Sequence, residues 1–381
     1  MVLIIRVFME KRTFENIGVE TSLLGYGCMR FPEKDGKIDE ERAQELIDRA
    51  YEGGVRYFDT AYPYHGGQSE PFIGKALKKY DRSSYMLATK LPIWEKEKIS
   101  DTEEFINKQL ERMGVDYVDF YLLHAIDEDK WNTVQELGII DSIEKLQAQG
   151  KIKHFGLSFH DEYEAYEKII TARKWDFVQL QINYIDIREQ AGLRGLELAE
   201  KLGIPVIVME PVKGGTLANL PDDVAEIFRA YDPESSLSSW AMRWCASFDN
   251  VKLILSGMTE MYQVEDNLKT FGDYKPMTDE EKKLVEKAAA KILSKMRNGC
   301  TDCRYCQPCP FGVNIPKNFD IWNKCFAYEN FENAKQRWAE MDDKEKAKNC
   351  VKCGKCEKKC PQKIEIRENL ERLQKEMDEL K

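Results

Sequence analysis

The sequence predicts an α/β protein, in which a (β/α)8 TIM barrel is followed by a small, mostly helical domain rich in cysteine. From residue 20 to about residue 270, short apolar runs alternate with amphipathic helical patterns, which is typical of βαβ repeats and a parallel sheet. Eight such units in roughly 250 residues favour a closed barrel over an open doubly wound sheet. Eight of the eleven cysteines form two runs, at residues 300–309 and 350–360, which indicates a separate module there.

The barrel strands are expected at the apolar runs, and the helices between them. The runs are residues 22–27, 55–59, 85–89, 118–123, 154–158, 177–181, 205–209 and 253–256. The helical patterns are residues 40–52, 71–79, 102–113, 141–149, 162–171, 193–202, 233–247 and 261–270. No Gly-x-Gly-x-x-Gly follows the first strand, which argues against a Rossmann domain.

A further helix is expected at 279–297, because apolar residues recur there at helical spacing without glycine or proline. Such a helix spans roughly 28 Å, about the height of a barrel. We therefore expect it to return the chain to the catalytic end, with the last domain packed there. The predicted domains are the barrel at 1–275, the connecting helix at 276–299 and the cysteine-rich domain at 300–381. Residues 1–8 are interpreted as an alternative start or an extra strand.

Composition limits the classes of partner. The net charge is −10, and nucleic-acid binding usually needs a basic surface. No apolar stretch approaches the ~20 residues that span a bilayer, and no secretory leader pattern opens the chain. We expect a cytoplasmic protein with no nucleic-acid or membrane partner.

Two cysteine runs repeat near the C-terminus. The first is Cys300-x2-Cys303-x2-Cys306-x2-Cys309-Pro310, and the second is Cys350-x2-Cys353-x2-Cys356-x3-Cys360-Pro361. They resemble the two-cluster arrangement of bacterial ferredoxins, which implies a ferredoxin-like domain with two [4Fe–4S] clusters. By that resemblance, one cluster is held by Cys300, Cys303, Cys306 and Cys360, and the other by Cys350, Cys353, Cys356 and Cys309.

Two other interpretations of the cysteines remain open. Zinc is satisfied by four ligands, so three evenly spaced cysteines before a Cys-Pro pair exceed its needs. Disulfides would require an oxidising compartment. The spacing of Cys309 is the least regular, because two residues separate it from Cys306 where the ferredoxin pattern has three.

Polar residues stand where predicted barrel strands end. Asp59 ends the second strand, Tyr64 follows five residues later, Lys90 ends the third strand and His124 ends the fourth. Catalytic residues of barrels come from these strand ends, which lie within side-chain reach of each other. Each residue alone could be a cap, a solvated rim residue or a rim aromatic, but four in register favour a catalytic site.

These four residues resemble the catalytic tetrad of the aldo-keto reductase family, and the resemblance covers roughly residues 10–270. It implies that Tyr64 protonates a carbonyl oxygen as hydride reaches the carbon. Lys90 would favour the phenolate by charge, Asp59 would hold Lys90, and His124 would orient the carbonyl.

The resemblance also implies a nicotinamide cofactor, NAD(H) or NADP(H). Its expected contacts are Gly27, Cys28, Met29, Ser158, Gln179, Met209, Gly257, Gln263 and Asn267. Gln179 could equally be a satisfied interior amide. Residues 257–263 hold no lysine or arginine, the usual partners of a phosphate, so preference for NADPH is expected to be weak unless Lys213 or Lys269 compensates.

Three functions fit the two halves of the chain. The first is an oxidoreductase that acts on a small carbonyl or alcohol at the barrel and is coupled to electron transfer, with an electron-transfer protein as partner. The second is an electron-transfer enzyme that binds FMN at the barrel mouth, where Gly214 and Gly215 offer a phosphate loop. The third is a non-catalytic redox sensor or docking protein. Trp94 and Trp131, in the expected loops 93–100 and 125–136, could line an apolar substrate pocket.

Overall fold

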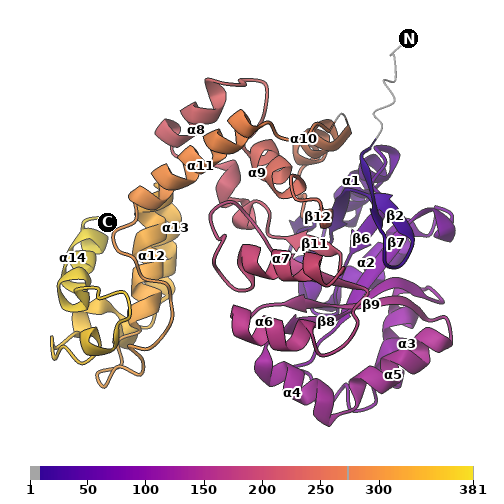
Figure 1. Cartoon of the computed structure of the whole chain (residues 1–381), viewed down its shortest axis with the longest axis horizontal. Helices are drawn as coiled ribbons and strands as arrows, with labels where there is room; N and C mark the ends of the chain where they lie inside the picture. The colour runs from indigo at the N-terminus through magenta and orange to yellow at the C-terminus, as the bar shows by residue number, and fades with distance from the viewer. Residues whose placement is uncertain (1–8, 273, 381) are drawn as a thin grey trace. The chain divides into compact units, whose positions relative to one another are not determined.

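A computed structural model describes residues 9–272 and 274–380, and it confirms the predicted barrel. Eight parallel strands pair in chain order, and β12 pairs with β3 to close the sheet. Figure 1 shows the barrel strands among the helices that follow them. The strands are β3 (Leu24–Gly27), β6 (Tyr57–Asp59), β7 (Met86–Leu91), β8 (Val118–Ile126), β9 (Ile152–Phe159), β10 (Phe177–Gln181), β11 (Val206–Met209) and β12 (Val251–Ser256). Each overlaps one of the eight predicted runs. Residues 1–8, interpreted above as an alternative start or an extra strand, lie outside the described residues.

Helices connect the strands and cover the outside of the barrel. They are α1 (Glu40–Glu52), α2 (Ser69–Leu77), α3 (Thr102–Met113), α4 (Glu128–Glu136), α5 (Ile139–Ala148), α6 (Tyr163–Ile170), α7 (Gly192–Lys201), α9 (Leu237–Ala246) and α10 (Met261–Gly272). The structure corrects the expected loop at 125–136, most of which is α4. Asp127 caps that helix by accepting a hydrogen bond from Lys130 N at 2.8 Å. Trp131 is buried there, 6.0 Å from the ring of Trp175, and so belongs to the core.

Two short antiparallel hairpins precede α1 and were not predicted. They are β1 (Lys11–Phe14) with β2 (Val19–Ser22), and β4 (Glu33–Lys34) with β5 (Lys37–Ile38). The first hairpin inserts Phe14, fully buried, among Tyr57, Phe120 and Phe177 near the starts of three barrel strands. Aromatic rings therefore fill the amino end of the barrel, and the polar side chains lie at the carboxyl end.

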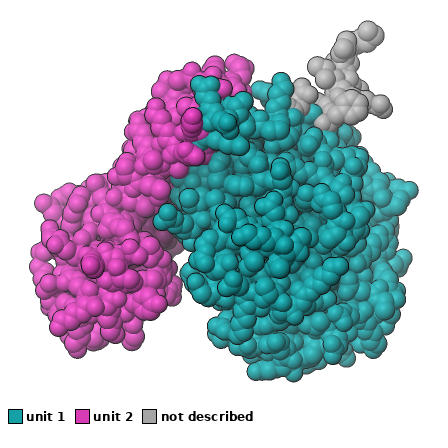
Figure 2. All heavy atoms as spheres, in the orientation of Figure 1, with its two compact units in different colours: residues 1–215, 238–282 teal, residues 216–237, 283–381 magenta. Residues whose placement is uncertain are grey.

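The chain divides into two compact units, coloured in Figure 2. The first contains residues up to 215 and residues 238–282, and the second contains residues 216–237 and 283–381. The predicted domain limits assign residues 216–237 to the barrel, whereas the structure groups them with the second unit. That segment contains α8 (Asp222–Arg229), whose Asp223 pairs with Lys291 and Lys295.

The second unit is mostly helical, as predicted. Its helices after α8 are α11 (Asp279–Ser294), which begins in the first unit, α12 (Ile315–Tyr328), α13 (Phe331–Glu340) and α14 (Ile366–Glu379). Phe319 and Trp322 of α12 pack with Leu370 and Leu373 of α14 in its core, beside the cysteine runs. Among the described residues, no helix is both long and apolar enough to cross a bilayer.

Candidate active site and cluster cavities

Three of the four predicted catalytic side chains form one hydrogen-bonded group at the carboxyl ends of β6 and β7. The buried ammonium of Lys90 donates to the carboxylate of Asp59, to the carbonyl oxygen of Thr60 at 2.8 Å and to the Tyr64 hydroxyl at 3.2 Å. Lys90 and Asp59 are 1% and 3% exposed, so water screens this ion pair little. The lysine therefore has a fixed position beside the tyrosine oxygen.

The surroundings of Tyr64 keep its hydroxyl protonated. Burial raises the pKa of Tyr64, and the neighbouring Lys90 ammonium opposes that rise. Burial disfavours the charge on Lys90, but the interactions with Asp59 and Tyr64 together outweigh burial and raise the pKa of Lys90. At neutral pH the site thus holds a protonated tyrosine beside a charged lysine, which is the state a proton donor requires.

His124, at the end of β8, faces the same group. Its ring meets that of Tyr64 edge to face, with centroids 5.9 Å apart, and lies 5.0 Å from the ring of Trp94. Burial lowers the pKa of His124 well below its ordinary value, and the positive charge of Lys90 lowers it further. Its buried Nδ1 has no hydrogen-bond partner among the described residues. His124 is therefore neutral near pH 7 and can act as a hydrogen-bonding group.

A second, largely buried polar network supports the first, and sequence reasoning missed it. Glu70 of α2 accepts from Thr89 Oγ1 and from Gln109 Nε2, both at 2.7 Å, and from Arg112 Nε at 2.9 Å. Gln109 also donates to the Lys90 carbonyl oxygen at 3.1 Å. Arg112 donates to the carbonyl oxygen of Gly67 at 2.5 Å, in the turn that begins at Tyr64. The network thus ties α2 and α3 to the Lys90 backbone and to the turn that begins at Tyr64.

Helix spacing was the sequence feature that could have revealed this network. Gln109 and Arg112 are three residues apart and therefore share one face of α3. Glu70 lies in the first turn of α2. A buried carboxylate needs such partners, because burial raises the pKa of Glu70 while Thr89, Gln109 and Arg112 act to lower it.

Several predicted cofactor contacts are engaged within the barrel. Gln179 donates to Asp59 Oδ2 at 3.2 Å and so helps to hold the catalytic carboxylate. Ser158 Oγ accepts from Ala125 N at 2.8 Å. Gln263 accepts from Thr259 N at 2.7 Å at the start of α10, and Asn267 donates to Ser256 Oγ at 2.9 Å. These four side chains already have protein partners.

The remaining predicted contacts lie at strand ends or just beyond them. Gly27 ends β3 and Met209 ends β11, both partly exposed. Cys28 is buried, and its amide donates to Asp59 O at 2.8 Å, whereas Met29 is 54% exposed. Gly257 follows β12, and a Cβ there would lie only 2.7 Å from Arg30 Cγ.

The charged groups near β11 and β12 are arranged differently from what the sequence of residues 257–263 alone suggests. Lys213 pairs with the buried Asp186, which also accepts from Asn183 Nδ2 at 3.0 Å. Glu260 pairs with Arg42 of α1 at 2.8 Å. Arg30 is exposed, and its side chain lies against Gly257, so the structure brings one cation to this loop from the segment after β3. The spacing of residues 257–263, in the loop after β12, could not reveal this contact with Arg30.

The eight cysteines of the two runs line two cavities in the second unit. The Cys350 cavity, about 290 Å³, is lined by Cys309, Cys350, Cys353 and Cys356, together with Cys306. The Cys300 cavity is lined by Cys300, Cys303, Cys306 and Cys360, with Ile315 and Phe319 among its apolar walls. Across the described residues, no three His, Cys, Asp or Glu side chains are arranged to hold a single metal ion. Four thiols are the ligand set of a [4Fe–4S] cluster, so the residues of both cavities suit one.

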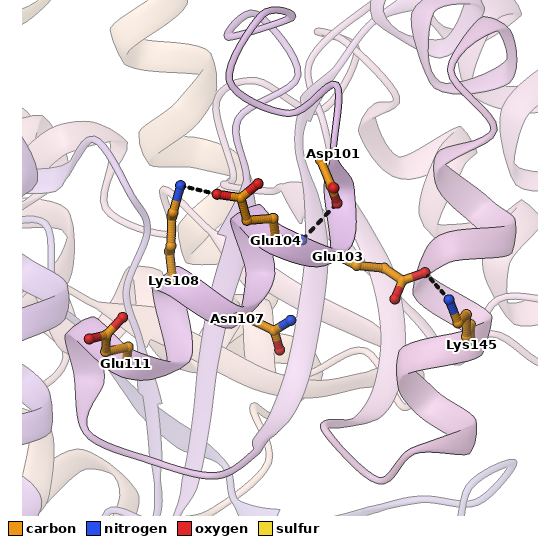
Figure 3. A pocket seen from close by; sticks show the side chains of 7 residues that line it. All are labelled: Asp101, Glu103, Glu104, Asn107, Lys108, Glu111 and Lys145. Atoms are coloured by element: carbon orange, nitrogen blue, oxygen red, sulfur yellow. Dashed lines mark hydrogen bonds and ion pairs between the residues drawn. The ribbon is translucent and has the colours of Figure 1, made fainter.

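A larger surface hollow of about 610 Å³ lies between α3 and α5 (Figure 3). Glu104 pairs with Lys108 at 2.5 Å and Glu103 with Lys145 at 2.5 Å, while Asp101 caps α3. None of the four predicted catalytic residues lines it. Both lysines that line it are paired with glutamates, and we assign it no site.

Comparison with known families identifies both parts of the chain. The aldo/keto reductase family model matches residues 23–290, and a 4Fe-4S dicluster domain model matches residues 299–365. The chain belongs to the aldo/keto reductase family. It is an oxidoreductase of that family, and it carries a 4Fe-4S dicluster domain after the reductase domain.

Individual relatives share the barrel at low identity. The chain is 25% identical over 309 residues to the NADH-specific methylglyoxal reductase of Escherichia coli, covering 67% of this chain and 89% of the relative. It is 24% identical over 311 residues to L-galactose dehydrogenase of Arabidopsis thaliana, covering 76% and 96%. The holo form of an aldo-keto reductase from Bacillus halodurans superposes with a TM-score of 0.62 at 26% identity, covering 74% of this chain and 96% of that one.

Proposed function

We propose that the chain reduces or oxidises a small carbonyl or alcohol at Asp59, Tyr64, Lys90 and His124, with a nicotinamide cofactor. The observation that carries the proposal is the Lys90 ammonium, which is bonded at once to Asp59 and to the Tyr64 hydroxyl. The name of the Escherichia coli relative supports NADH and a small aldehyde as the first cofactor and substrate to test. It supports the nicotinamide alternative over FMN.

The four side chains divide the chemistry between them. A bound reduced nicotinamide supplies hydride to the carbonyl carbon, and the carbonyl oxygen then needs a proton. Tyr64 donates that proton, and Lys90 stabilises the phenolate that remains by its positive charge. Neutral His124 donates a hydrogen bond to the same oxygen and orients the carbonyl. Asp59, held by Gln179, keeps Lys90 charged and in place.

Two [4Fe–4S] clusters are proposed for the two cysteine cavities. Cys300, Cys303, Cys306 and Cys360 would hold one, and Cys350, Cys353, Cys356 and Cys309 would hold the other. The lining of the two cavities supports this crossed assignment, because each set of four thiols shares one cavity. Bound clusters supply one-electron transfer, so we propose that an electron-transfer protein is a partner.

The test of the barrel chemistry is Tyr64→Phe, which removes only the hydroxyl. We expect turnover of methylglyoxal with NADH to fall by ~10²-fold or more, the usual contribution of general acid catalysis. The dissociation constant of NADH, measured by fluorescence titration, should stay unchanged. Tyr62→Phe is the matched control and should keep wild-type turnover. Equal turnover in Tyr64→Phe and wild type would remove Tyr64 from the mechanism.

A further inference from the structure

The rim of the Cys350 cavity is positively charged in a chain that is acidic overall. Residues 350–363 contain five lysines and one glutamate, whereas the whole chain carries a net charge of −10. Lys355, Lys358 and Lys359 line this cavity and are exposed. Within the part of the chain that the structure describes, none of these three lysines forms an ion pair. Their charge is therefore available to a partner.

Exposed apolar side chains line this cavity together with the lysines of its rim. Phe311 and Val351 line the same cavity and are 48% and 54% exposed. Cys353, a proposed cluster ligand, is exposed beside them. Large apolar residues exposed inside a charged rim are typical of protein–protein interfaces. The surface thus combines an apolar centre, unpaired positive charge and an exposed thiol.

The Cys300 cavity has no comparable rim. Among its lining residues the single cation is Arg304, which pairs with Asp302 at 3.3 Å. The next residue, Tyr305, is exposed, but no lysine is among the described residues that line this cavity. The two cavities therefore differ in charge although their cysteine patterns repeat. A negatively charged partner would be attracted to the Cys350 side.

We propose that the rim of the Cys350 cavity is the docking surface for a small acidic protein that carries single electrons. The inference rests on the proposed function, since such a carrier is useful only to a chain that holds clusters. Complementary charge speeds the encounter of two proteins, and electron-transfer encounters use small interfaces. Phe311 and Val351 supply the small apolar contact, and Lys355, Lys358 and Lys359 supply the attraction.

The experiment measures binding of a plant-type [2Fe–2S] ferredoxin, an acidic carrier, to the cluster-loaded full chain by calorimetry at low and high salt. The test variant is Lys355→Glu/Lys359→Glu. The matched control is Lys283→Glu/Lys287→Glu, which reverses two exposed charges on α11. We expect the dissociation constant of the test variant to rise about 10-fold or more, with the control within about 2-fold of wild type. Wild-type affinity should fall as salt rises.

Iron and sulfide content is measured first, because it separates a failure of the proposed clusters from a failure of the proposed docking surface. A chain that never holds iron contradicts the proposed clusters. A loaded chain that fails to bind ferredoxin, or binds it equally at all salt concentrations, overturns the docking surface. Wild-type self-association in the ultracentrifuge that the test variant abolishes would assign the rim to a second copy of the chain instead. If the double variant loses its clusters, the affinity of the Lys358→Gln variant for ferredoxin and the salt dependence of wild-type binding decide whether the rim is the docking surface.

Discussion

Lys90 is the residue on which the electrostatics of the barrel site depend. It is buried, charged and bonded to three oxygens, those of Asp59, Thr60 and Tyr64. A buried ion pair that loses one partner typically costs about 3–5 kcal/mol, because the other charge is left without compensation. Lys90 therefore contributes both to folding and to the acidity of Tyr64.

Lys90→Met should lower activity and move its pH dependence. The protonated tyrosine is the active form in reduction, so the rate falls as pH rises through the pKa of Tyr64. The Lys90 ammonium lowers that pKa, and its removal raises it. The falling limb of kcat/KM should therefore move to higher pH, which a pH–rate profile measures. An unmoved limb would show that Lys90 does not control the tyrosine.

Cofactor preference is a second question at the scale of single residues. Hydrogen bonds to a charged group contribute about 1.5–3 kcal/mol, so a dedicated cation on the 2′-phosphate would favour NADPH by roughly 10-fold or more. Residues 257–263 contain no such cation, and Lys213 is already paired with Asp186. We expect the dissociation constants of NADH and NADPH to differ by less than about 10-fold. A stronger, salt-sensitive preference for NADPH that Arg30→Ala abolishes would contradict this and identify Arg30 as the cation.

At the scale of elements, the buried network of Glu70 joins α2, α3 and β7. Glu70→Ala would leave Arg112 and Gln109 without their shared acceptor, and we expect the free energy of unfolding to fall by about 1–3 kcal/mol. Because Arg112 also holds Gly67 in the turn after Tyr64, kcat should fall more than KM changes. Denaturation and steady-state kinetics check this.

Arg112→Lys is the companion variant for the network. Lysine keeps the charge near Glu70 but lacks the planar fork that reaches both the carboxylate and the Gly67 carbonyl oxygen. It should keep more stability than Glu70→Ala yet still lower kcat. Wild-type kcat in both variants would mean that the network supports the fold alone.

Elements with strong periodicity could be predicted from the sequence, and shorter or less regular ones could not. Helix Glu40–Glu52 and helix Thr102–Met113 have the predicted limits, because amphipathic spacing and flanking Asp caps define them. The four-residue strands of the first hairpin are too short for their alternation to be distinctive. Trp131 was assigned to a loop, but it is a core residue on a helix whose cap, Asp127, was not recognised.

The same contrast holds for the site. Asp59, Lys90 and His124 could be proposed because strand ends converge in a barrel, and the structure brings them together with Tyr64. Supporting residues around the site come from helix faces, as Gln109 does when it donates to the Lys90 carbonyl oxygen, or from distant segments, as Arg30 does beside Gly257. Helix spacing could have indicated the first kind, but the separation of Arg30 from Gly257 along the chain leaves no spacing that predicts their contact. The roles of the individual site residues stay predictions.

At the scale of the whole molecule, crossed ligation makes the two cysteine runs depend on each other. Cys309→Ser should remove a ligand from the cluster of the second run, and we expect iron to fall from about eight toward about four atoms per chain. Cys325→Ser, in the core of the same unit, should leave iron unchanged. Iron analysis and the visible spectrum check both variants. Full iron in Cys309→Ser would contradict the crossed assignment. The expected packing of the cluster domain on the catalytic end of the barrel also stays a prediction.

Residues 216–237 have a consequence for how this protein can be cut or recombined. The chain passes from one unit to the other at 215–216, 237–238 and 282–283, so the second unit is not a simple tail. A fragment that begins after residue 282 would lack Asp223, the partner of Lys291 and Lys295. A gene fusion that moved only the cysteine-rich segment to another reductase would therefore transfer an incomplete module, and a clean exchange would need a two-part graft.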